Sequence, residues 1–162
     1  MKYTPIVGTL GYVLNPEKTH VLMVHRIARE HDAHFGKYNG VGGKLERDEE
    51  IVQGMKRELL EETGLTAQKL TLRGTVNWTN FGPKNEDWLG FIFIIESFSG
   101  TPFESNAEGK LEWVALNKIN DLPMWEGDRF FLPLLFDNDP RVFHGYMPYE
   151  GNQPKSFSFS RI

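Results

Sequence analysis

The sequence predicts a mixed α/β domain that contains more strand than helix, with a sheet flanked by helices. Two observations carry this prediction. Runs rich in β-branched and aromatic residues recur along the chain, and one clear helical pattern interrupts them. The length of 162 residues suits a single domain, which we expect to span residues 1–162.

The N-terminal part predicts two strands and a glycine-rich loop. Residues 6–14 and 21–25 are apolar and β-branched, and the turn-forming segment 15–18 lies between them. Residues 35–44 contain four glycines in ten positions, which argues against a helix interior. We therefore expect a loop there, with its backbone in close approach to another group.

One helix is predicted over residues 49–63. Apolar residues recur at helical spacing, Asp48 is a suitable N-cap, and Gly64 is a suitable stop. The remaining elements follow the same reasoning. We expect a hairpin from 71–80 and 88–97 around the turn 82–85, a short strand at 112–116, a buried helix at 130–136 and an edge strand at 155–160.

Composition excludes several classes of protein. The absence of cysteine excludes disulfides, thiolate metal sites and cysteine nucleophiles. No apolar run approaches the roughly 20 residues that span a bilayer, and the N-terminus lacks the features of a signal peptide, so we expect a cytoplasmic protein with no membrane partner. The net charge of −4 provides no basic footprint for nucleic acid. The negative charge of a polyanionic ligand would have to be neutralised by a few local Lys and Arg side chains or by divalent cations.

Three carboxylates share one face of the predicted helix: Glu58, Glu61 and Glu62 fall within an arc of roughly 100°. Their repulsion must be offset by solvent or by divalent cations. The preceding glycines, the neighbouring Arg57 and the absence of softer ligands favour a hard cation such as Mg²⁺ over a solvated face. Such a site suits attack by water on a phosphoanhydride, with a carboxylate taking the proton.

The spacing Gly43-x5-Glu49-x7-Arg57-Glu58-Leu59-x-Glu61-Glu62-x-Gly64-Leu65 resembles the complete box of the Nudix family. The resemblance implies the Nudix fold, an α/β/α arrangement of a mixed sheet sandwiched between helices, with a strand-loop-helix-loop catalytic unit. It also implies hydrolysis with Mg²⁺, for which Mn²⁺ is an alternative. Glu58, Glu62 and the carbonyl of Gly42 would be metal ligands, Glu61 a further ligand or the general base, and Arg57 and Glu49 would orient the carboxylates.

Segments outside the box are similar to the MutT-type oxidised-purine nucleoside triphosphate diphosphatases. These segments are residues 35–40, 100–105, 124–125 and 143–146. By position, the resemblance implies base contacts from Asn39, Phe35, Trp125 and Asp128 and a distal metal contact from Glu108. Glu104 competes with Glu108, and Glu126 offers a substitute for an acidic residue that this chain lacks beside Asp128.

The residues themselves leave other interpretations open. Trp125 could be a core or lid residue, Phe35 could serve loop packing, and Asn39 could cap the glycine turn. The pair His31 and His34 is more typical of a solvated loop than of a metal site. Lys44 could reach a phosphate or face water.

The leading hypothesis is hydrolysis of a nucleoside triphosphate to monophosphate and pyrophosphate, with preference for oxidised purines such as 8-oxo-dGTP. A second hypothesis keeps the chemistry but takes pyrimidine triphosphates, sugar nucleotides or dinucleoside polyphosphates. A third is a nucleotide-binding module without catalysis. A homodimer through the hairpin edge or the apolar C-terminal segment is a further expectation.

Overall fold

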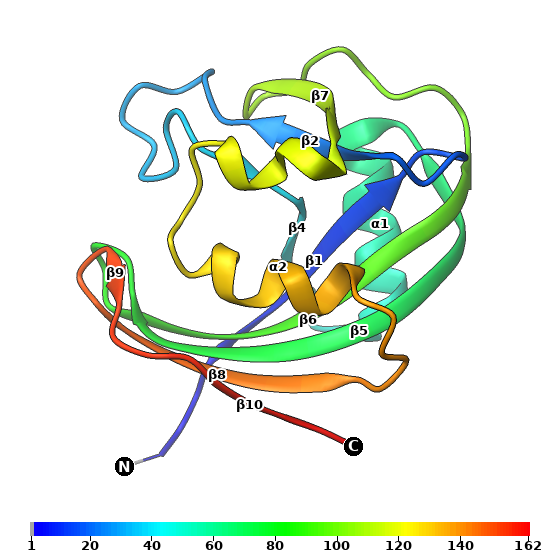
Figure 1. Cartoon of the computed structure of the whole chain (residues 1–162). Helices are drawn as coiled ribbons and strands as arrows, with labels where there is room; N and C mark the ends of the chain where they lie inside the picture. The colour runs from blue at the N-terminus through cyan, green and yellow to red at the C-terminus, as the bar shows by residue number, and fades with distance from the viewer. Residues whose placement is uncertain (1) are drawn as a thin grey trace.

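The computed structural model describes residues 2–162 (Figure 1). Its elements in chain order are β1 (Ile6–Leu14), β2 (His20–His25), β3 (Tyr38–Asn39), β4 (Val41–Lys44), α1 (Ile51–Thr63), β5 (Thr66–Phe81), β6 (Glu86–Ser99), β7 (Lys110–Ala115), the 3₁₀ helix η1 (Leu116–Asp121), α2 (Asp128–Phe136), β8 (Phe143–Glu150), β9 (Gln153–Pro154) and β10 (Ser158–Arg161).

The strands form one mixed sheet with the order β10-β8-β5-β6-β1-β2-β3. β1 runs parallel to β6, and β5 runs parallel to β8, whereas the β5–β6 hairpin is antiparallel. β5, β6 and β8 are long curved strands that sweep beneath α2 (Figure 1). β10 lies at the edge of the sheet, as the alternating C-terminal residues predict, although it starts at Ser158, three residues later than expected.

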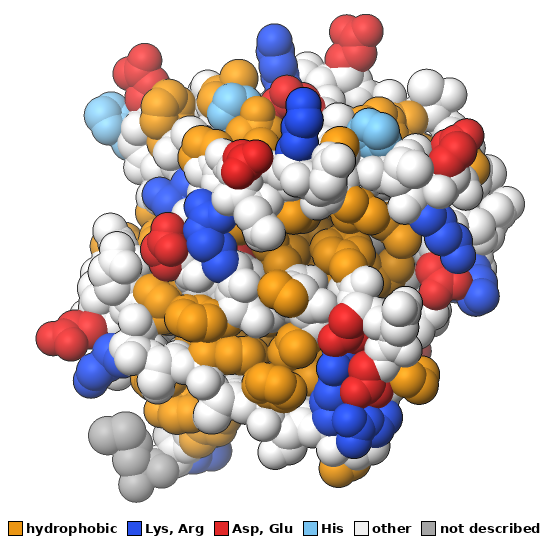
Figure 2. All heavy atoms as spheres, viewed as in Figure 1, with side chains coloured by type: hydrophobic (Ala, Val, Ile, Leu, Met, Phe, Trp, Pro, Cys, Tyr) orange, Lys and Arg blue, Asp and Glu red, His pale blue; other side chains and the backbone are white. Residues whose placement is uncertain are grey.

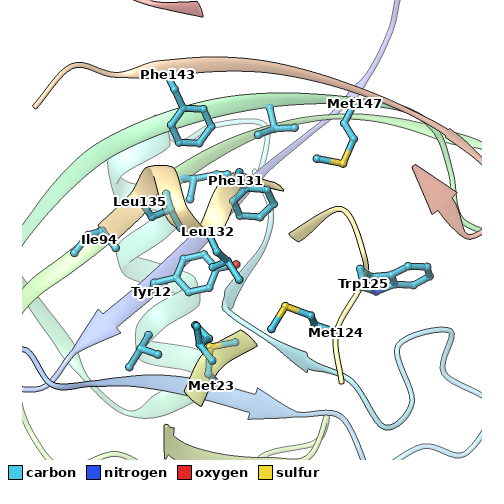
Figure 3. Packing of buried hydrophobic residues seen from close by; sticks show 14 of the residues in the cluster. Tyr12, Met23, Ile94, Met124, Trp125, Phe131, Leu132, Leu135, Phe143 and Met147 are labelled. Atoms are coloured by element: carbon cyan, nitrogen blue, oxygen red, sulfur yellow. The ribbon is translucent and has the colours of Figure 1, made fainter. Parts of the chain in front are cut away.

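The two faces of the sheet carry separate cores. Along β1, Tyr12 and Leu14 belong to the cluster that packs with α2, whereas Val13 between them belongs to the cluster that packs with α1. β6 alternates in the same way, because its side chains point to opposite faces in turn. The α/β/α layering is thereby confirmed. Figure 3 shows the α2 side, where Tyr12 lies beside Phe131 and Leu132.

The glycine-rich stretch is the main correction to the predicted elements. Residues 38–39 and 41–44 form β3 and β4, and β4 pairs antiparallel with residues 8–11 of β1. The expected close approach of the backbone is present, because a Cβ on Gly42 would overlap the carbonyl of Thr9. Glycine therefore serves strand pairing here, and not only a loop.

The helix α1 begins two residues later than expected. Its N-cap is Glu50, whose side chain accepts from the amide of Gln53, and the Gln53 side chain accepts from the amide of Glu50 in return. The predicted N-cap, Asp48, was wrong because this reciprocal capping box lies further along. Gly64 ends the helix in the left-handed conformation at φ 78°, with its amide donating to Leu60 O, as predicted.

The C-terminal part differs more from the prediction. β5 and β6 extend beyond the expected strands, although the turn between them at 82–85 is confirmed. α2 begins at Asp128, two residues earlier than expected, and β8 was not predicted as a strand. Among residues 2–162, no helix has both the length and the apolar character that crossing a membrane requires.

Candidate active site

The carboxylates of α1 lie against the glycines of β4. Gly42 donates its amide to Glu62 Oε2 over 3.1 Å, which ties the two elements together. A Cβ on Gly43 would stand only 2.6 Å from Glu58 Oε1. The missing side chain at Gly43 therefore makes room for the Glu58 carboxylate beside the strand.

Arg57 holds three carboxylates of this region together. Its guanidinium donates to both oxygens of Glu49 over 2.7 and 2.9 Å, to Glu58 over 2.9 Å and to Glu61 over 3.2 Å. A further bond of 3.2 Å reaches the carbonyl of Lys44 at the end of β4. The pKa of Glu49 is lowered to about 2, mainly by the hydrogen bonds from Arg57. The arginine thus fixes the helix face relative to the glycine strand.

Glu62 is the carboxylate whose charge is least compensated. Burial, followed by the nearby charges of Glu108 and Glu58, raises its pKa to about 8. Burial also raises the pKa of Glu58, although Arg57 opposes that effect. Glu61 differs, because its side chain is 57% exposed. The cluster therefore combines carboxylates that repel one another in a partly buried place with one that faces solvent.

The donor set fits a hard divalent cation. Carboxylate and carbonyl oxygens are the ligands that Mg²⁺ and Mn²⁺ take, and a cation would offset the repulsion that raises the pKa of Glu62. Glu108 belongs to the same electrostatic group, with Arg26 Nη1 3.4 Å from its Oε2. Within the described residues, no three His, Asp or Glu side chains already stand in the arrangement of a metal site, so the carboxylates would have to rearrange around an ion.

A cavity of about 690 Å³ opens beside this cluster. It brings together several of the residues that the sequence singled out, and four basic side chains lie in its wall. The charged side chains of the box are not among the lining residues: Glu49, Arg57, Glu58, Glu61 and Glu62. The lining residues include Gly42, Gly43, Lys44 and Glu108 near the box, Asn39, Trp125 and Asp128 further along, and the basic residues Arg26, Arg29 and Lys84. Figure 2 shows the face on which α2 lies, where hydrophobic side chains gather in the middle and charged ones lie mostly around them.

Three residues predicted outside the box are not in the cavity wall. Phe35 is 43% exposed and does not line the cavity, so the structure does not support its predicted base contact. Glu104 is exposed and lies outside the lining, whereas its competitor Glu108 lines the cavity. Glu126 is exposed, stands 3.4 Å from Arg129 and is not among the lining residues.

Trp125 is both a cavity residue and a core residue. It is only 5% exposed and lies on the segment that leads into α2 (Figure 3). The ring of Phe81 packs against it with centroids 4.9 Å apart, and Lys37 Nζ lies 4.6 Å from its ring centroid. These neighbours restrict the area of the indole that a base can reach.

Asp128 is a partly buried acid at the start of α2. Burial raises its pKa to about 7, and the positive charge of Arg129 offsets only part of this effect. The charge of Asp128 also contributes to raising the pKa of Tyr12 and of Tyr149. Near neutral pH this carboxyl can therefore act as a hydrogen-bond donor or as an acceptor.

Several cavity residues were not predicted from the sequence. Trp78 and Trp88 face each other across the β5–β6 hairpin, and Arg26 and Arg29 come from the segment after β2. None of them belongs to a motif, and aromatic residues in strands are more typical of a core. His34 was expected in a solvated loop, but it is partly buried and lines the cavity, so that expectation was wrong.

Comparisons with known proteins point to one family. Residues 4–135 match the family described as NUDIX domain. The oxidized purine nucleoside triphosphate hydrolase of Danio rerio is 36% identical over 117 residues, which cover 72% of each chain. The protein of the same description from Mus musculus is 33% identical over 153 residues, 94% of this chain and 91% of the relative. A crystal structure of a mutator MutT protein from Bacillus halodurans aligns with a TM-score of 0.81 at 27% identity, covering 96% of this chain and 97% of that one.

Proposed function

Because the chain belongs to the Nudix family of hydrolases, we propose that it hydrolyses a nucleoside triphosphate to the monophosphate and pyrophosphate, with preference for oxidised purines such as 8-oxo-dGTP. One observation carries this proposal. A single cavity extends from Gly42 and Gly43, which lie against the carboxylates of Glu62 and Glu58, to a chamber with aromatic, amide and acidic side chains. A nucleotide can therefore place its phosphates and its base at the two ends of the same space.

The phosphate end would use a divalent cation, as Nudix hydrolases generally do. We assign Mg²⁺, with Mn²⁺ as a substitute, to Glu58, Glu62 and the carbonyl of Gly42, with Glu108 as a distal contact. When bound, the ion would neutralise the phosphate chain and polarise the phosphorus centre.

The chain's own residues complete this end of the site. Arg57 and Glu49 hold the carboxylates in place through the bonds described above. Glu61 is exposed and close enough to solvent to take a proton from the attacking water, and it is also the candidate for a further metal ligand. Lys44, Arg26 and Arg29 in the cavity wall would meet phosphate oxygens.

The base end would be formed by Asn39, Trp125 and Asp128. Asn39 and Asp128 offer hydrogen-bond donors and acceptors, and the indole of Trp125 offers an aromatic wall. A base stacked on an aromatic side chain gains about 1–3 kcal/mol, and the restricted access to Trp125 argues for the lower part of this range. Phe35 has no place in this arrangement.

A substrate panel tests the proposal. Purine triphosphates with and without an 8-oxo group, pyrimidine triphosphates, a sugar nucleotide and a dinucleoside polyphosphate would each be incubated with Mg²⁺, and kcat/KM would be compared. We expect release of pyrophosphate with the highest kcat/KM for an oxidised purine. Equal rates across the panel would contradict the base preference, and binding without release of any product would contradict catalysis.

Asp128→Asn tests the base end separately from the chemistry. The asparagine keeps the size of the side chain but removes the acid, so KM for the preferred purine triphosphate should rise about tenfold. Glu126→Gln is the matched control, since Glu126 is exposed, acidic and outside the cavity. If both variants changed KM equally, Asp128 would have no specific contact with the base.

A further inference from the structure

We propose that His34 is a positioning residue of the base end, which fixes both Trp125 and Asn39 by accepting a hydrogen bond from each on one ring nitrogen. The inference rests on the proposed function in one respect, namely that Trp125 and Asn39 contact the base. His34 lies outside the box and outside the segments that resemble other proteins.

The contacts converge on His34 Nδ1. The indole Nε1 of Trp125 donates to it over 2.7 Å, and the amide Nδ2 of Asn39 lies 3.4 Å from the same atom. The rings of His34 and Trp125 also meet edge-on, with centroids 5.4 Å apart and planes at 78°. An indole N–H can only donate, so Nδ1 must carry the lone pair and Nε2 the proton.

The backbone that carries His34 is fixed by its neighbours. The backbone amide of His34 donates to Asp32 Oδ1 over 3.0 Å, while the other carboxylate oxygen of Asp32 accepts from Arg26. The loop closes further through Gly36, whose amide donates to Arg26 O over 2.7 Å. Burial, followed by the charge of Arg26, lowers the pKa of His34 to about 4, which keeps the ring neutral at pH 7.

This arrangement selects one orientation of the Asn39 side chain. If the amide were turned over, Oδ1 would face the lone pair on His34 Nδ1, and two acceptors would repel each other. Nδ2 is therefore directed at His34, and Oδ1 is left for another partner. Asn39 lines the cavity, so its carbonyl oxygen can accept from an N–H group on the edge of a base. The histidine thus determines which hydrogen-bonding group the asparagine presents.

His34 also explains the position of the indole. Trp125 is 91 residues away along the chain, on the segment before α2, and its N–H would otherwise be buried without an acceptor. A buried donor without a partner is costly, so the loss of Nδ1 should let the ring turn or admit water. If His34 served only to fill space, the volume of its ring would be sufficient, and the hydrogen-bond acceptor at Nδ1 would not be needed.

Three variants separate the effect of the hydrogen-bond acceptor at position 34 from the effect of the side-chain volume. His34→Ala removes both, whereas His34→Asn keeps an acceptor oxygen close to the position of Nδ1. His31→Ala is the matched control, because His31 is exposed on the same segment. The assay is KM and kcat with an 8-oxo purine triphosphate and with its unmodified counterpart, with thermal unfolding as the check of folding.

We expect His34→Ala to raise KM for the preferred purine about tenfold, with kcat changed by less than about twofold, and to reduce discrimination between the two purines by a similar factor. His34→Asn should recover most of this loss, and His31→Ala should behave as the wild type. An unchanged KM in His34→Ala, or equal losses in His34→Ala and His34→Asn, would overturn the proposal.

A second measurement needs neither a substrate nor a variant. In the ¹⁵N NMR spectrum of the free wild-type protein, His34 should be the Nε2–H tautomer, and the Trp125 indole proton should show a downfield shift from its hydrogen bond. The Nδ1–H tautomer would overturn the inference. If the tautomer is as expected but no triphosphate in the panel is hydrolysed, the proposed function fails while the positioning contact stands.

Discussion

Replacing Glu62 by glutamine tests whether the crowded carboxylates of α1 lower the stability of the fold. A bound cation would be expected to restore that stability. Glutamine has nearly the same shape and keeps an oxygen that can accept from the Gly42 amide, as Glu62 does over 3.1 Å. It removes the negative charge that lies near Glu58 and Glu108. The variant should therefore fold in the same way while lacking a charge that burial disfavours most and that Glu108 and Glu58 repel.

The magnitude follows from the pKa of Glu62, which is raised from 4.5 to about 8. Between these values the folded protein binds more protons at Glu62 than the unfolded chain does, so the free energy of unfolding falls as the pH rises through this window. The full difference corresponds to roughly 4–5 kcal/mol at pH 9, and partial exposure of the side chain reduces it to about 2–4 kcal/mol.

The assay is urea unfolding of wild type and Glu62→Gln in EDTA at pH 5 and pH 9. We expect nearly equal free energies of unfolding at pH 5 and a more stable variant at pH 9. Glu61→Gln is the control, because Glu61 is on the same helix but 57% exposed, and its stability should follow the wild type. Mg²⁺ should stabilise the wild type at pH 9 more than Glu62→Gln, and the variant should turn over roughly 10²–10⁴-fold more slowly. A stability difference that does not change with pH would refute the reasoning.

Two further predictions concern the frame around the carboxylates. Arg57→Ala should reduce kcat by at least about 100-fold, because Glu49, Glu58 and Glu61 lose their common partner, while Lys56→Ala on the exposed neighbour should have no effect in the same assay. Gly43→Ala should reduce turnover about tenfold or more by displacing the Glu58 carboxylate, with a small change in melting temperature because only a flexible side chain has to move; a melting temperature lowered as far as activity would contradict this.

The helix and its charged face could be predicted because the information is local. Arg57, Glu58 and Glu61 lie within five consecutive residues, and helical geometry alone brings Arg57 and Glu61 to 3.2 Å. The stop at Gly64 is equally local. The start was misplaced because Asp48 and Glu50 both suit an N-cap, and only the reciprocal bonds with Gln53 decide between them. Local patterns thus define a helix better than they define its first residue.

The base end could not be derived from local patterns, because its residues come from distant parts of the chain. His34 appeared to belong to a solvated loop, since the HDAH segment is polar and has no apolar periodicity. Its burial depends on Trp125, 91 residues later, and on Asp32 and Arg26, which close the loop beneath it. A polar segment can only be identified as a wall of a cavity once the partner that covers it is known.

Trp78 and Trp88 in the cavity wall also could not be predicted, because their position depends on how distant strands pair. Trp78 lies against Gly90 on the neighbouring strand, and Trp88 lies 3.2 Å from where a Cβ on Gly8 would be. β1 and β6 are parallel and pair Gly8 with Gly90, although 81 intervening residues separate them in the sequence. Each indole can lie along the sheet only because its neighbour has no side chain. A sequence pattern shows tryptophans and glycines in separate strands, and the cavity arises only when the pairing places one opposite the other.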